Sequence, residues 1–152
     1  MRVVDLLQQG YTAEIRLKEA FIKTAEYHKT KPEIYYECQA FASLSDEHAR
    51  YFRKALKRYE KSFDMESRND NFLELIPEHG TGHNLADDLH YIRLLNHESD
   101  FYLSLLLQAS TAINDLDLEN ACKFFTEENS KQSHWLVERI SREVSQLLPI
   151  AG

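Results

Sequence analysis

The sequence is poor in the residues that bend or interrupt a chain. Of its 152 residues, only four are glycine and three are proline. Sharp turns and strand bends rely heavily on these two residues, so the composition argues against an all-β fold. Hydrophobic residues make up 43% of the chain, which is enough for one sizeable core at this length. We therefore expect a single helical domain over residues 1–152.

Features of exported, membrane and nucleic-acid-binding proteins are also missing. No apolar run approaches the roughly 18 residues needed to cross a bilayer, and the first residues do not read as a signal peptide. Cys38 and Cys122 lack CxxC spacing, so we expect reduced thiols that fill the core. The net charge of -7 repels phosphate backbones. These absences predict a cytoplasmic protein that binds neither nucleic acid nor membranes.

Helical spacing of apolar residues dominates the rest of the chain. Gly10 is expected to end a short N-terminal helix, Thr12 to cap a longer one, and Pro32 to start the next. The pattern fails between residues 63 and 82, which suggests a long connection. We expect an all-α, up-down four-helix bundle with a long crossover between its second and third helices, plus a short N-terminal helix. The expected helices are 3–9, 12–28, 33–61, 83–113 and a last one from about 117 to near 149.

Two histidines and two glutamates fall at matching heights in the two predicted hairpins. Glu14 and His48 are equally far from the first turn, and Glu98 and His134 are almost equally far from the second. Residues equidistant from the turn of an antiparallel hairpin lie at one level. His48 and Glu98 lie on mostly apolar stripes, whereas Glu14 and His134 share theirs with charged residues. All four side chains are candidate ligands of a divalent metal.

The segments SDEHARYFRKAL, HESDFYLSLLLQA and FFTEENSKQSHWL give this arrangement a family likeness. The chain resembles the ferritin-like superfamily, and rubrerythrin-type proteins most of all, over most of residues 12–145. Such proteins hold two iron or manganese ions with one Glu from the first helix of each hairpin and a Glu-x-x-His from the second. The resemblance implies Glu14 and Glu98 as single carboxylates and His48 and His134 as histidine ligands.

The chain departs from that pattern at the two bridging carboxylates. The positions three residues before the histidines hold Ser45 and Lys131 instead of glutamate. Glu47, Glu127 and Glu128 are near in sequence, but helical geometry turns them about 100° or more from the required direction. We therefore expect a bundle that has lost the standard dimetal centre and serves as a dimeric scaffold or partner-binding protein. The alternative is a non-haem iron or manganese oxidoreductase that acts on oxygen or peroxide.

Two further patterns are read as solvated surface. His83, His90 and His97 recur every seven residues, too far apart for one ion to bind two of them on a straight helix. The second helix carries a band of basic residues, which we expect to face solvent. The band comprises Arg50, Arg53, Lys54, Lys57, Arg58 and Lys61. Eight tyrosines and eight phenylalanines supply packing and suit a homodimer interface as well.

Overall fold

The computed structural model describes residues 2–59 and 84–147, and these form four long helices. They are α1 (Val3–Tyr27), α2 (Pro32–Tyr59), α3 (Leu85–Ala112) and α4 (Leu116–Leu147). No strand occurs in this part of the chain. The all-α prediction is confirmed. None of the described helices is long and apolar enough to cross a membrane.

The N-terminal helix is not separate, because α1 continues through Gly10. The prediction that Gly10 ends a short helix is therefore wrong. A Cβ at this position would lie 3.3 Å from the Leu106 side chain and 3.4 Å from Phe52. Glycine lets α1 approach α2 and α3 closely here, and packing against them compensates for its low helix propensity.

Local sequence signals set the other helix ends. Proline at position 32 occupies the first position of α2, where its missing N–H costs nothing. Asn84 caps α3 by accepting a hydrogen bond from the Asp87 N–H at 2.9 Å. Asn114, at φ 59°, turns the chain between α3 and α4, and Asp115 accepts from the Leu118 N–H at 3.0 Å.

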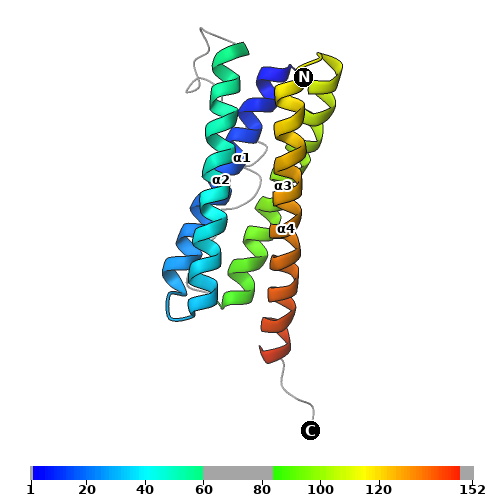
Figure 1. The fold of residues 1–152 in the computed structure, drawn as a ribbon. Helices are drawn as coiled ribbons and strands as arrows, with labels where there is room; N and C mark the ends of the chain where they lie inside the picture. The colour runs from blue at the N-terminus through cyan, green and yellow to red at the C-terminus, as the bar shows by residue number, and fades with distance from the viewer. Residues whose placement is uncertain (1, 60–83, 148–152) are drawn as a thin grey trace.

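Side-chain contacts at one end of the bundle show the directions of the helices. His28 Nε2, just after α1, lies 2.7 Å from Asp88 Oδ2 in the first turn of α3. Arg139, near the end of α4, pairs with Glu33 at the start of α2 at 2.9 Å. The end of α2 and the start of α3 are consequently at opposite ends of the bundle (Figure 1). The predicted crossover between them lies outside the described residues and stays a prediction.

The core consists of two apolar clusters with a polar level between them. One cluster, around Leu7, Phe52 and Leu106, fills the half nearest the start of α1. The other, around Phe21, Ile34 and Leu89, fills the opposite half. The part of each helix that lies between the clusters carries buried polar side chains, and these form the candidate site.

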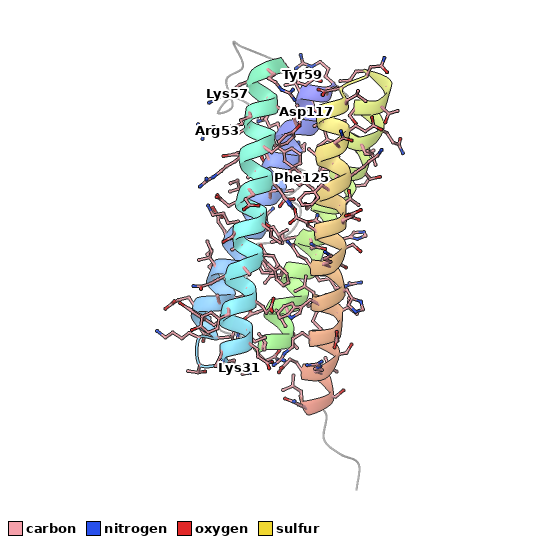
Figure 2. All side chains as sticks on the ribbon, in the orientation of Figure 1. Lys31, Arg53, Lys57, Tyr59, Asp117 and Phe125 are labelled. Atoms are coloured by element: carbon pink, nitrogen blue, oxygen red, sulfur yellow. The ribbon has the colours of Figure 1, made fainter. Side chains whose placement is uncertain are left out.

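The basic band of α2 faces away from this core. Arg50, Arg53, Lys54, Lys57 and Arg58 are exposed, and Figure 2 shows Arg53 and Lys57 extending away from the bundle. Arg58 pairs with Asp115 and Asp117, each at 3.7 Å. The solvated-face interpretation is confirmed for the five described members, and Lys61 lies outside the described residues.

Candidate functional site

A layer of polar side chains from all four helices crosses the middle of the bundle. We call it the polar layer. Its members other than Glu128 are at most 2% exposed, and the Glu128 side chain is 16% exposed. The polar layer comprises Glu14, Ser45, His48, Asn96, Ser99, Glu128, Asn129 and Gln132.

His48 lies at the centre of the polar layer between two carboxylates. Its Nδ1 is 3.3 Å from Glu14 Oε1 on α1. Its Nε2 is 2.9 Å from Glu128 Oε1 on α4. The imidazole ring stacks on Phe125, with ring centroids 4.0 Å apart, and Figure 2 shows Phe125 between α2 and α4. The ring is therefore held in one orientation, with each nitrogen facing an acidic side chain.

This environment favours the charged form of His48. Burial alone lowers the pKa of the imidazole, but the hydrogen bonds and charges of Glu14 and then Glu128 outweigh it and raise the pKa above its ordinary value of 6.5. A protonated imidazole carries a proton on both nitrogens, so that Nε2 donates to Glu128 at 2.9 Å while Nδ1 faces Glu14 Oε1 at ion-pair distance, 3.3 Å. The raised pKa thus favours a positive charge on His48 between acidic groups from α1 and α4.

Hydrogen bonds extend the polar layer from Glu14 to the other hairpin. The Ser99 hydroxyl donates to Glu14 Oε1 at 2.5 Å, and Asn129 Nδ2 donates to Ser99 Oγ at 3.1 Å. A buried amide pair completes the layer, with Asn96 Nδ2 donating to Gln132 Oε1 at 3.3 Å. A continuous chain of polar contacts therefore runs from Glu128 through His48 and Glu14 to Asn129.

Several buried atoms of the polar layer have no hydrogen-bond partner among the described residues. They are Glu14 Oε2, Ser45 Oγ, His48 Nδ1, Asn129 Oδ1 and Gln132 Nε2. Outside the layer, Glu98 Oε2 is also buried and has no hydrogen-bond partner among the described residues. Unmet groups of this kind are costly in a protein interior and mark positions where a water, ion or ligand is accommodated.

Of the four residues predicted as metal ligands, the structure brings two together. Glu14 and His48 are both fully buried and in contact. Glu98 is only partly buried, and the next residue, Ser99, faces Glu14 instead. The His134 side chain is 85% exposed and lies 3.9 Å from Glu138 on the surface. The structure does not place His134 in the layer.

The inward positions of α4 explain this difference. Cys122, Phe125, Asn129, Gln132 and Leu136 are all buried and recur at spacings of three and four. His134 follows Gln132 by two residues, or about 200° around the helix, so the two side chains point in nearly opposite directions. The face of α4 that is defined by its apolar residues also includes Asn129 and Gln132, so this pattern is the sequence signal that identifies them.

Two expectations about charged neighbours are also corrected. Lys131 is exposed and does not face the polar layer, because Asn129 occupies the inward position on this part of α4. Glu128, expected to point away, contacts His48, since its long side chain reaches along the boundary between α2 and α4. No local pattern marks Glu128, because its role depends on the neighbouring helix.

As arranged, the polar layer does not fit a metal centre. A metal-bound histidine offers an unprotonated nitrogen to the ion and uses the other one for a supporting hydrogen bond. Here the two carboxylates lie at different nitrogens of His48, so one ion cannot contact both of them and the ring together. Within residues 2–59 and 84–147, no group of three or more His, Cys, Asp or Glu residues is placed to hold a metal ion.

The predicted flank of histidines on α3 is surface. His90 and His97 are exposed, and His83 lies outside the described residues.

Comparison with family models, curated proteins and solved structures finds no match for this chain. A four-helix bundle hosts many unrelated functions, so inference about function depends on the polar layer and the surface around it.

Proposed function

We propose that this chain is a ferritin-like helical bundle without a dimetal centre that serves as a dimeric scaffold. The observation that carries the proposal is the position of His48 between Glu14 and Glu128. The protonated imidazole supplies positive charge at the level where a metal ion would otherwise balance carboxylates. Removal of water from these charges is costly, and their pairing offsets that cost.

The inward residues of the polar layer support the loss of a metal centre. In a ferritin-like bundle, α1 and α3 would each supply a Glu, and α2 and α4 a Glu-x-x-His each. Glu14 and His48 keep the ligand type at their positions. The remaining positions are Ser45, Ser99, Asn129 and Gln132, all of them neutral and buried. Hydroxyl and amide groups in these places keep the layer polar without the negative charge that a pair of divalent ions needs.

Metal content tests this part of the proposal directly. Protein from iron- and manganese-supplemented medium, purified without chelators or a His-tag, is expected to carry close to no metal by elemental analysis. A combined variant, Ser45→Glu, Ser99→Glu, Asn129→Glu and Gln132→His, is expected to take up about two ions per chain. Absence of metal from the folded variant would contradict the ferritin-like assignment of these positions.

Exposed apolar side chains on α3 support the scaffold role. Leu94 is 42% exposed and Phe101 is 50% exposed. They are seven residues apart and so lie on one stripe of the helix. Exposed apolar groups on a single stripe are typical of an interface, and we assign this one to a second copy of the chain.

Light scattering after size exclusion tests the dimer. The wild-type protein is expected to elute as a dimer, and Leu94→Ser with Phe101→Ser is expected to weaken the dimer tenfold or more, about the effect of losing central apolar contacts. Phe124→Ser is the matched control, because Phe124 is 59% exposed but lies on α4. A monomeric wild-type protein, or equal effects of the two substitutions, would contradict the interface.

The alternative function is a non-haem iron or manganese oxidoreductase acting on oxygen or peroxide. It is favoured by one observation, the fully buried Glu14 Oε2 that has no partner among the described residues although His48 is adjacent. Elemental analysis separates the two functions. About two ions per wild-type chain would overturn the scaffold proposal and make peroxide turnover the next assay.

A further inference from the structure

A polar cleft opens between α3 and α4 beside the polar layer. Its volume is about 490 Å³, which lies within the range of small-molecule sites. Arg93, Asn96, His97 and Asp100 line it from α3, and Asn129 and His134 are among the side chains from α4. The cleft shares Asn96 and Asn129 with the polar layer, and His97 brings it to the edge of the apolar stripe on α3.

Opposite charges lie at the two ends of the cleft. Arg93 and Asp100 are seven residues apart on α3, which corresponds to about 10 Å along the helix. Neither side chain forms an ion pair with another residue in the described part of the chain, although most other arginines of the four helices do. Although Asp100 is exposed, desolvation by the surrounding atoms of the cleft raises the pKa of its carboxyl, and His97 opposes this effect. A cationic ligand group would compensate this carboxylate.

Buried amides form the floor between these charges. Asn96 is 2% exposed and Asn129 is 1% exposed, yet both line the cleft. The Asn129 Nδ2 group donates to Ser99, which fixes the amide so that Oδ1 remains an acceptor. That Oδ1 atom has no hydrogen-bond partner among the described residues. The floor therefore retains hydrogen-bonding capacity that the protein itself does not use.

We propose that the cleft binds a small zwitterion whose carboxylate and ammonium groups are separated by a short flexible chain, as in an ω-amino carboxylate. The carboxylate pairs with the Arg93 guanidinium, which is suited to bidentate recognition. The ammonium group lies against Asp100 and donates from its remaining N–H groups to Asn129 Oδ1, while the linking chain spans the cleft toward Arg93. Opposite charges at the two ends disfavour ligands that carry only one sign of charge.

Nuclear magnetic resonance with 5-aminopentanoate tests the site. The side-chain amide signals of Asn96 and Asn129 are expected to shift on titration, with a Kd of about 1 mM for so small a ligand. Pentanoate and pentylamine, which each lack one of the charges, are expected to bind about tenfold more weakly. Equal binding of pentanoate would overturn the zwitterion assignment, and unshifted amide signals at saturation would overturn the site.

Substitution of the two charged residues provides the second test. Arg93→Gln and Asp100→Asn are each expected to weaken binding about tenfold or more, because each removes a charge-assisted contact. Both residues are exposed, so the fold is retained, as circular dichroism can verify. Lys54→Gln is the matched control, since it removes an exposed charge from α2 outside the cleft. Wild-type affinity in both cleft variants would refute the proposal.

Discussion

The two carboxylates beside His48 are expected to contribute unequally to stability. Glu14 and His48 are both 0% exposed, so Glu14→Gln leaves a buried charge poorly compensated and should lower the free energy of unfolding by about 3–5 kcal/mol. The Glu128 side chain is 16% exposed, and water can partly replace it. Glu128→Gln should therefore cost about 1.5–3 kcal/mol, the usual range for a hydrogen bond to a charged group.

The raised pKa of His48 gives this contribution a definite pH dependence. The folded protein holds the proton more tightly than the unfolded chain, whose histidine titrates near 6.5. The stabilisation is thus fully present below about pH 6.5 and is lost as the pH rises through the higher pKa of the folded state. The free-energy difference between wild type and His48→Gln should accordingly be larger at about pH 6 than at about pH 9.

Urea unfolding at these two pH values measures both effects. The four proteins to compare are the wild type and the variants Glu14→Gln, Glu128→Gln and His48→Gln. At each pH, the free energy of unfolding of His48→Gln is subtracted from that of the wild type. This difference cancels the contributions of the other titrating groups, provided that the m-values agree. Equal costs for the two glutamate substitutions would refute the burial argument. A wild-type advantage that grows with pH would refute the assignment of His48 as the buried cation.

Three further predictions concern packing, thiols and the surface. Gly10→Leu should lower the free energy of unfolding by about 1–3 kcal/mol through overpacking against Phe52, measured by urea unfolding. Burial raises the pKa of Cys38 and Cys122 to about 12, so neither thiol should react with a thiol reagent at neutral pH until the protein unfolds, and rapid labelling under native conditions would contradict this. His134→Gln should change the melting temperature little, equivalent to about 0.5 kcal/mol or less, because the side chain is exposed.

Much of the fold could be predicted because its signals are local. The start of α2 at Pro32 and the turn around Asn114 and Asp115 depend on residues close in sequence. Apolar spacing likewise indicated that His48 faces the core, and the distances from the first turn indicated that Glu14 lies beside it. Both residues are fully buried and in contact.

The prediction failed where one helix had to be placed against another. Gly10 has the signature of a helix end, but the close approach of Phe52 makes it a packing position inside α1. In the second hairpin, the distances from the predicted turn indicate Glu98 and His134 as the ligands at the level of the site. The apolar register of α4 instead places Gln132 inside and His134 in solvent.

The sequence by itself determined the helical class of the chain and the ends of its helices around Pro32 and Asn114, because hydrogen bonds within helices and local capping depend on neighbouring residues. Tertiary structure decided which polar side chains meet in the polar layer. A rotation of about 100° separates successive residues on a helix, so an error of one position exchanges core for surface. Only the packing of α1, α2 and α4 against one another brings Glu14 and Glu128 to the two nitrogens of His48.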